Sequence, residues 1–280
     1  MNPAGHPFST KLAMRFVSGL LLLTLSLTCP LEALAHFLVL VPSQDVVEGG
    51  DGRTVDLRIE FTHPMEKGPR MDMEHPQAFG VMMRGSRIDL LERLKASRDE
   101  RGRTAYTASA ELTRPSDYVF YVEPTPYWEP AEQKMIVHYS KVVVDYLGAE
   151  TGWDAMVGTP VEIEPLVRPY GLWTGNAFRG VVHYEGEPVP FAEIEVEYLN
   201  GSDGEDALIP NGAFATQVIK ADERGVFSYT MPKAGWWGFA ALVEGEETMT
   251  SPEGNEVSVE LGGLMWVRAV DMKTASSDGE

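Results

Sequence analysis

The sequence predicts an all-β protein made of two β-sandwich domains of the immunoglobulin/transthyretin-like type, with one short helix in the first domain. Two observations lead to this fold class. Short segments of alternating apolar and polar residues recur along the chain, and turn-forming Gly and Pro residues separate them. Only one segment has the apolar spacing of a helix, which leaves strands as the main elements.

The first 35 residues have the three parts of a secretory signal peptide. Lys11 and Arg15 form a short basic segment, an apolar run follows from Phe16 to Thr28, and Ala33 and Ala35 form a small-x-small cleavage site. The apolar run is too short for a membrane span of about 20 residues. We therefore expect an exported, periplasmic protein that does not span the membrane.

Cleavage at this site would leave His36 as the first residue. A lipid anchor at Cys29 is the alternative, which Thr28 disfavours because a small residue usually precedes a lipoprotein cysteine. Cys29 is the only cysteine of the chain. Its loss with the leader would leave no disulfide and no thiolate ligand, so any metal must be held by nitrogen, oxygen or thioether groups.

The chain is strongly acidic, with a formal net charge of −19. The leader contains Lys11, Arg15 and Glu32, a net charge of +1, so its removal takes the charge from −19 to −20. This acidity argues against a nucleic-acid partner, whose phosphates require a basic face. It is compatible with attraction of cations, although solubility alone explains many acidic surfaces.

The first domain is expected over residues 36–165. An opening strand runs over residues 36–41, and residues 54–61 alternate with apolar side chains on one face. Residues 88–96 are the expected helix, because apolar side chains recur there at every third position. Residues 135–146 form a long strand.

The second domain is expected over residues 172–272, after a stiff linker from Pro165 to Gly171 that two prolines bracket. Its short strands are separated by turns that contain Gly and Pro, a pattern typical of a Greek-key sandwich. Residues 273–280 are small and polar, and we expect them to form a disordered tail.

An N-terminal His36 would offer a metal ion two nitrogens at once. A free terminal amine has a pKa of about 7.7 to 8.0, so a cation can displace its proton while imidazole Nδ1 closes a chelate ring. His63 and His138 occupy strand positions that face the core, where a ring nitrogen needs a partner. Gathered around the new terminus, the three imidazoles would form a histidine brace. The alternative for His63 and His138 is an ordinary buried histidine bonded to a carbonyl group. For His36 the alternative is that cleavage falls elsewhere or that it is simply an exposed first residue.

The loop after His63 supplies second-tier metal ligands. Met71 and Met73 offer soft thioethers that suit copper(I), and Asp72 and His75 suit borderline divalent ions. Methionines also fill gaps beneath loops, so packing is the alternative for Met71.

The segment from Glu123 to Pro130 is rich in proline, aromatic and acidic residues and leads to the strand of His138. Exposed aromatic side chains commonly mark recognition surfaces, and Glu129 or Glu132 would lie near the metal. An equally good interpretation is a loop folded over the end of the sandwich, with its aromatic rings capping the core.

No enzymatic motif supports catalysis. The sequence has no phosphate loop, no dinucleotide glycine fingerprint, no His-Glu-x-x-His and no nucleophile elbow. The sequence therefore predicts a binding protein without catalytic residues rather than an enzyme.

Several motifs spread over nearly all of the expected mature chain carry a family resemblance. They are Ala35–Phe37, Val41–Ser43, Phe61–Pro64, Met71–Met73, Phe79–Val81, Tyr127–Glu132, Ile136–Tyr139, Arg168–Gly175 and Ala234–Ala240. They resemble the exported family formerly labelled as a nickel transporter subunit, whose members accompany cobalt and nickel importers of the energy-coupling-factor type.

This resemblance implies a periplasmic accessory protein that captures Ni²⁺ or Co²⁺ and passes it to a membrane permease. His36, His63 and His138 stand at matching positions and are the inferred ligands, whereas His75 lies outside the family pattern. Ligand chemistry alone would rank Cu²⁺ above nickel and cobalt, so the resemblance is what favours the latter two.

The second domain separately resembles carboxypeptidase-regulatory or transthyretin-like domains. The motifs that carry this resemblance are Gly180–Val182, Gly186–Ala192 and Asp222–Phe227. Such domains are usually structural, so we expect it to support the first domain or to contact the permease.

Two other function classes remain open from the sequence. One is a copper-binding histidine-brace protein that acts as a carrier or an oxidoreductase, because the same nitrogen donors suit copper. The other is a structural or adhesive β-sandwich protein that binds no metal.

Overall fold

The computed structural model describes residues 36–202 and 206–273. The expected leader, its cleavage site, Cys29 and residues 274–280 of the expected tail lie outside the described residues. Within the described part of the chain, no helix is long and apolar enough to cross a membrane.

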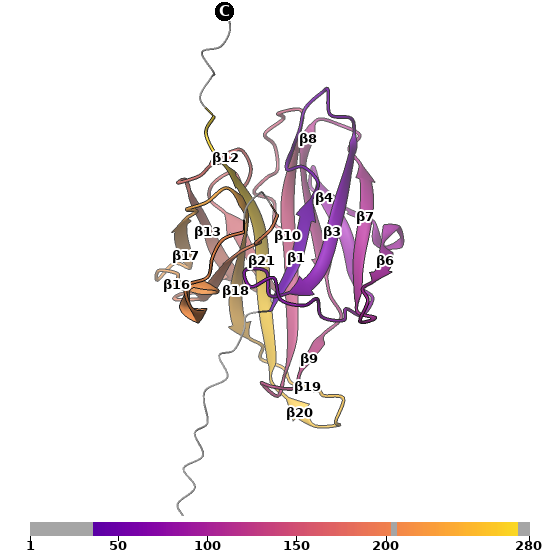
Figure 1. The fold of residues 1–280 in the computed structure, drawn as a ribbon, viewed down its shortest axis with the longest axis vertical. Helices are drawn as coiled ribbons and strands as arrows, with labels where there is room; N and C mark the ends of the chain where they lie inside the picture. Colours follow the sequence, from indigo (N-terminus) through magenta and orange to yellow (C-terminus); the bar gives the residue numbers. More distant parts are fainter. Residues whose placement is uncertain (1–35, 203–205, 274–280) are drawn as a thin grey trace, which may run out of the picture. The chain divides into compact units, whose positions relative to one another are not determined.

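The described chain consists of strands and two short 3-10 turns, so the prediction of an all-β protein is confirmed. Sheet A has four antiparallel strands in the order β1-β3-β7-β6 (Figure 1). Their bounds are Phe37–Pro42 for β1, Thr54–Thr62 for β3, Thr104–Glu111 for β7 and Lys95–Arg98 for β6. Along β3, Val55, Leu57 and Ile59 are buried while the residues between them are exposed up to Arg58, as the sequence alternation predicts.

Sheet B has eleven strands and the order β16-β15-β18-β21-β10-β8-β4-β5, with β2, β9 and β12 paired beside this path. The strands of its main path are Gln217–Lys220 (β16), Glu193–Tyr198 (β15), Gly235–Glu244 (β18), Val259–Val270 (β21), Lys134–Tyr146 (β10), Ser116–Glu123 (β8), Ala78–Met83 (β4) and Ser86–Asp89 (β5). The three short strands beside it are Val46–Val47 (β2), Tyr127–Glu129 (β9) and Leu172–Trp173 (β12).

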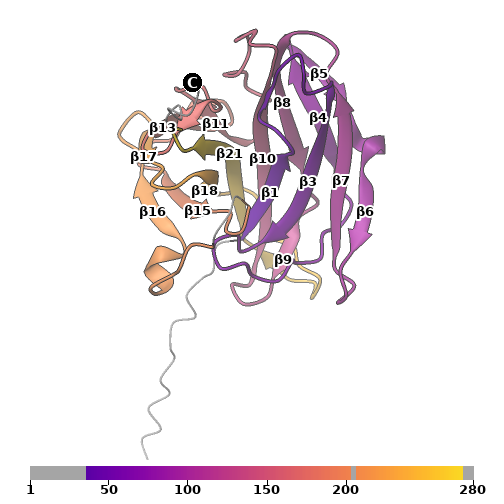
Figure 2. The same ribbon diagram turned by 45° about the horizontal axis from the view of Figure 1, so that its top comes forward.

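The two halves expected from the sequence share sheet B. Strand β10 of the first half pairs in parallel with β21 of the second, from Met135 opposite Val259 to Val142 opposite Trp266 (Figure 2). The two strands lie side by side although more than a hundred residues separate them, and all of the described residues belong to one compact unit.

A third sheet consists of β11 (Val161–Pro165), β13 (Ala177–Tyr184), β14 (Glu187–Pro188) and β17 (Val226–Thr230), and a small hairpin of β19 (Met249–Thr250) and β20 (Glu256–Val257) stands apart. Strand β11, expected in the first domain, pairs with β13 and so lies with the second half. The segment 165–171, expected as a linker, is held by hydrogen bonds to the folded strands. The Leu166 N–H donates to the Arg179 carbonyl, and the Tyr170 hydroxyl donates to the Asp117 carboxylate.

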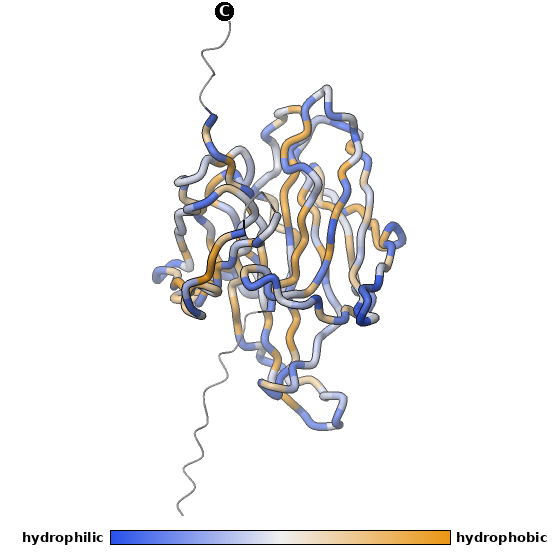
Figure 3. The backbone as a smooth tube through the Cα atoms, in the orientation of Figure 1, coloured by the Kyte–Doolittle hydropathy of each residue, from blue (hydrophilic) through white to orange (hydrophobic). Residues whose placement is uncertain are grey.

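Two large apolar cores fill the space between the sheets. The first lies behind sheet A and also contains Leu199, Trp236 and Trp266 from the second half of the chain. The second lies mainly around β13, β15 and β18, with Phe178, Phe239 and others at its centre. Figure 3 shows hydrophobic residues along the central strands and hydrophilic ones in the connecting turns, as this burial requires.

The prediction of a helix over residues 88–96 is wrong. Residues 86–89 form β5, residues 91–93 form a single 3-10 turn (η1) and residues 95–98 form β6. The segment passes from the edge of sheet B to the edge of sheet A, where pairing with β4 and β7 satisfies its backbone groups. A helix of nine residues would be marginal by itself, since nucleation is costly, and edge pairing replaces it.

Candidate metal site

His36 and His63 lie side by side at one end of sheet A. The antiparallel register of β1 and β3 places Phe37 opposite Thr62, so the residue before β1 meets the residue after β3. The centroids of the two imidazole rings are 4.6 Å apart. The strand pairing thus brings together two histidines that are far apart in the sequence.

Two aromatic rings line the other sides of His36. Phe61 stacks on it with ring centroids 5.6 Å apart, and Tyr127 is tilted against it at 5.9 Å. Phe61 and Tyr127 also contact each other, 5.3 Å apart. These contacts remove the imidazole from water without supplying it with charge.

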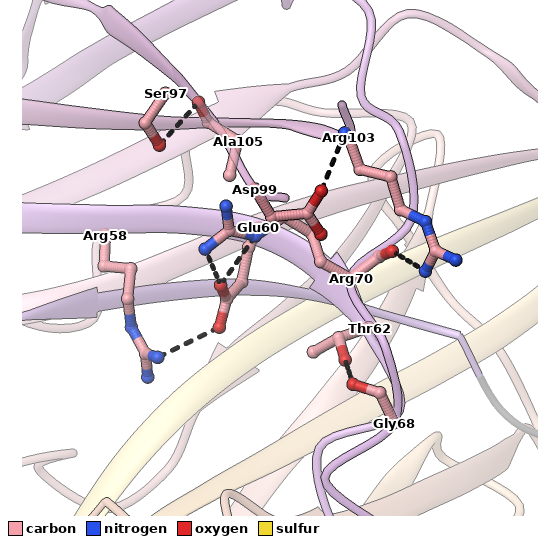
Figure 4. A network of polar contacts seen from close by, with 9 residues as sticks. All are labelled: Arg58, Glu60, Thr62, Gly68, Arg70, Ser97, Asp99, Arg103 and Ala105. Carbon is pink, nitrogen blue, oxygen red and sulfur yellow. Dashed lines mark hydrogen bonds and ion pairs between the residues drawn. The ribbon is translucent and has the colours of Figure 1, made fainter. Parts of the chain in front are cut away.

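The loop after β3 holds His63 through short backbone bonds. The Gly68 N–H donates to the His63 carbonyl at 3.0 Å, and Thr62 Oγ1 donates to the Gly68 carbonyl at 2.9 Å (Figure 4). A Cβ at Gly68 would lie 2.9 Å from Cβ of His63, closer than real side chains approach. Glycine at this position therefore lets the loop fold back onto the histidine.

An arginine and carboxylate network fastens the far end of the same loop. Glu60 accepts from Arg58 at 2.9 Å and from Arg70 at 3.1 and 3.3 Å (Figure 4). The Arg103 guanidinium in turn donates to the Arg70 carbonyl, and the Arg103 N–H donates to Asp99 at 2.9 Å. Charged groups that are partly buried and mutually paired hold their positions better than an exposed pair does.

Glu129 contacts His36 from β9. Its Oε2 lies 3.1 Å from Nε2 of His36, and the two side chains are 10% and 11% exposed. Pairing of β9 with β10, with Glu129 opposite Lys134, places the carboxylate there. Because Glu129 engages Nε2, Nδ1 is the ring nitrogen left for a chelate with the terminal amine.

Burial lowers the pKa of the His36 imidazole, and the neighbouring His63 and His138 lower it by smaller amounts. With the opposing effect of Glu260 included, the pKa is about 4. At neutral pH the ring is therefore uncharged, and its contact with Glu129 joins a neutral imidazole to a carboxylate. A neutral imidazole is the form that binds a metal ion, so the folded chain pays no cost of deprotonation at this ligand.

His138 lies on the other side of Phe61. The centroids of these two rings are 5.9 Å apart, and the histidine is 3% exposed. It stands on β10 opposite Gly262, where an added Cβ would lie 2.4 Å from its Cδ2. Its Nε2 lies 3.5 Å from Oε1 of Glu260, too far for a good hydrogen bond, and within the described residues neither ring nitrogen has a hydrogen-bond partner.

The four second-tier candidates contact groups other than the histidine pair, and Met73 is buried in the first core. Asp72 accepts the Thr104 N–H at 2.7 Å, a bond that lowers the pKa of its carboxyl group. The His75 ring packs edge-on against Tyr106, 5.6 Å between centroids, with Nδ1 3.0 Å from the Pro76 carbonyl oxygen. Met71 packs against the first core.

Residues 36–202 and 206–273 contain no group of three or more His, Cys, Asp or Glu side chains arranged to hold a metal ion. The two clustered imidazoles of His36 and His63 therefore need a further donor. The terminal amine created by cleavage before His36 would be such a donor, and that cleavage falls outside the described residues.

Sequence reasoning placed Glu129 near the site but missed Phe61 and Glu260. The strand alternation predicts only that Phe61 faces the core, and it does not indicate that the ring contacts two histidines. Glu260 reaches His138 through the parallel pairing of β10 and β21. No local pattern in the sequence reveals a pairing of such long range.

Comparison with known proteins gives a family and no activity. A family model described as "Domain of unknown function (DUF4198)" matches residues 33–245. No curated protein matches the sequence significantly.

Solved structures match only weakly. A chimeric titin Z1Z2 tandem is 13% identical, with 81% of this chain and 98% of that chain covered and a TM-score of 0.21. PorU from Porphyromonas gingivalis is 11% identical, with 84% and 20% covered and a TM-score of 0.24. Trypsin-activated alpha-2-macroglobulin from Escherichia coli is 10% identical, with 83% and 16% covered and a TM-score of 0.24. This chain spans a fifth or less of the last two, and likeness at this level carries no conclusion about function.

Proposed function

We propose that this chain, which belongs to the DUF4198 family of domains of unknown function, is an exported protein that captures a divalent transition metal in the periplasm. In this proposal it passes the ion to the membrane permease of a nickel or cobalt importer. The observation that carries the proposal is the meeting of His36 and His63, with rings 4.6 Å apart, at the start of β1.

Three nitrogens form the proposed donor set: the amine and Nδ1 of His36 and the imidazole of His63. Glu129 acts from outside this set, because its contact with Nε2 orients the His36 ring. His138 is the fourth candidate, because its ring contacts Phe61, the same ring that stacks on His36.

An incomplete nitrogen set suits a protein that must release its cargo. Closed tetrahedral thiolate sites bind zinc as part of the fold, whereas a site with an open edge exchanges its ligands more readily. The donor set itself favours Cu²⁺ over nickel and cobalt. The resemblance to accessory proteins of nickel and cobalt importers is what supports the latter two as cargo.

The decisive test compares two forms of the protein, one that begins at His36 and one that retains Ala35. Retention of Ala35 acylates the His36 nitrogen and removes it as a ligand. We expect calorimetry to give one Ni²⁺ or Co²⁺ per chain for the first form and at least about tenfold weaker binding for the second, because even outer ligand partners contribute this much.

Two substitutions complete the experiment. His63→Asn should weaken binding to the form that begins at His36, while the matched control His75→Asn should leave it unchanged. Equal affinity in the two forms, or an effect of His75→Asn as large as that of His63→Asn, would overturn the proposed site. Copper titrated in parallel, with uptake of nickel and cobalt measured in cells that carry the importer, separates a transport accessory from a copper protein.

A further inference from the structure

A cavity of about 210 Å³ lies beneath the segment Pro124–Trp128. Three aromatic rings line it, those of Phe61, Tyr127 and Trp128, together with aliphatic side chains and prolines. Its polar lining includes His138, Asp72 and Glu74. Neither His36 nor His63 lines it, although Phe61 and Tyr127 of its wall also contact His36.

The walls of this cavity are fixed by the fold. Strand β9 pairs with β10, which places Tyr127 opposite Ile136 and Trp128 opposite Met135. On the other side, Thr125 Oγ1 donates to the His75 carbonyl at 2.8 Å. With prolines on either side of Thr125, the segment has little freedom to collapse into the space below it.

The electrostatic character of the cavity favours a cation. Asp72 and Glu74 are its ionisable carboxylates, and none of the described residues that line it is Lys or Arg. Aromatic rings present the negative face of their quadrupole to a cation, and cages of such rings bind quaternary ammonium groups. The carboxylates at the rim and the aromatic rings in the wall therefore both attract a cation.

His138 supplies a polar group for the rest of the ligand. It is 3% exposed, its Nε2 lies 3.5 Å from Oε1 of Glu260, and within the described residues neither ring nitrogen has a well-formed hydrogen bond. A buried polar group without a partner is costly, and a ligand hydroxyl or amine that bonds it would recover this cost.

The size of the cavity sets the size of the ligand. At about 30 Å³ for each water molecule, 210 Å³ holds about seven waters, or a compound of about seven non-hydrogen atoms. A bare metal ion would leave most of this space unfilled.

We propose that the cavity bounded by Phe61, Tyr127, Trp128 and His138 binds a small organic ammonium compound. The ammonium group lies against the aromatic rings and near Asp72 and Glu74, and a hydroxyl or second amine bonds His138. This site does not depend on the proposed metal function, because its binding is measured on metal-free protein.

Choline is the probe, because it has a quaternary ammonium group, a hydroxyl and seven non-hydrogen atoms. Its neutral isostere 3,3-dimethyl-1-butanol keeps the shape and the hydroxyl and lacks only the charge. With chelator present, calorimetry should show saturable binding of choline and about fivefold to thirtyfold weaker binding of the alcohol, the range that cation–π contacts supply. Absence of saturable choline binding, or equal binding of the alcohol, would overturn the proposal.

Substitutions place the binding in this cavity. Trp128→Leu should weaken choline binding by a similar factor, while the control Trp173→Leu, whose ring is 43% exposed on β12, should not. Because Trp128→Leu removes packing as well, Glu74→Gln serves as a second variant on an exposed side chain, with Glu92→Gln as its control. An unchanged affinity in both Trp128→Leu and Glu74→Gln would show that choline binds elsewhere.

Discussion

The surrounding strands place some single residues of this protein where a charge is buried or where an added atom would clash. Glu197 is one example, 2% exposed on β15, where it accepts the Met65 N–H at 3.0 Å and the Thr216 hydroxyl at 2.5 Å. Burial raises the pKa of this carboxyl from 4.5 to about 7, because the two hydrogen bonds do not fully offset the loss of water.

The raised pKa predicts a specific dependence of stability on pH. The folded state holds a proton on Glu197 that the unfolded state releases above pH 4.5, so the free energy of unfolding falls as pH rises from 4.5 to about 7. In Glu197→Gln the amide oxygen can accept the Met65 N–H and the amide nitrogen can donate to the Thr216 hydroxyl, and the side chain has no such proton. We therefore expect the free energy of unfolding of the variant, measured in urea relative to that of the wild type, to rise by on the order of 2 to 3 kcal/mol between pH 4.5 and pH 8.

The exposed Glu193→Gln is the control for this measurement, and the difference in its free energy of unfolding from that of the wild type should change little with pH. A constant difference between the Glu197→Gln variant and the wild type at the two pH values would contradict the raised pKa.

Gly262 predicts a second effect at the scale of one residue. An alanine Cβ there would lie 2.4 Å from Cδ2 of His138, on a central strand where neither backbone can yield. We expect Gly262→Ala to destabilise the fold by about 1 to 3 kcal/mol, as overpacking does. Gly50→Ala, with open space around its Cβ, is the matched control, and equal melting temperatures for the two variants would disprove the clash.

At the scale of elements, some strands are readable from the sequence and some are not. The alternation of β3 can be predicted from local periodicity, because one set of its side chains is buried. β10 can be predicted from its β-branched and aromatic residues, and nearly all of its side chains are buried. Residues 88–96 mislead because apolar spacing every third position also fits two short edge strands joined by a turn. The contact between His36 and His63 could not be predicted, because it depends on the register of β1 with β3, which no local pattern of the sequence specifies.

Two elements are joined by a buried ion pair whose loss should be costly. Lys141 of β10 lies 2.6 Å from Glu162 of β11, and both side chains are buried. Glu162 also accepts the N–H groups of Val157 and Gly158. Removal of one partner leaves an uncompensated charge, so Lys141→Met should destabilise the protein by about 3 to 5 kcal/mol in urea unfolding.

The double variant Lys141→Met with Glu162→Gln removes the stranded charge and keeps one of the two oxygen acceptors that bond the N–H groups of Val157 and Gly158. It should recover part of the lost stability. A double variant less stable than Lys141→Met alone would show that Glu162 does not depend on its partner.

At the scale of the whole molecule, sheet B and the first core make the two halves one folding unit. Trp236 and Trp266 of the second half fill the core behind sheet A, and β21 pairs with β10. We expect a single thermal transition that coincides for near- and far-ultraviolet circular dichroism. Residues 36–171 alone should show no cooperative transition, and two separate transitions in the full chain would contradict a shared core.

The place of β21 sets the order in which the molecule is completed. This last long strand lies between β18 and β10, at the middle of sheet B rather than at its margin. A ribosome must therefore deliver almost the entire polypeptide before the gap can close, and a product truncated ahead of Val259 keeps two unpaired strand edges that invite aggregation.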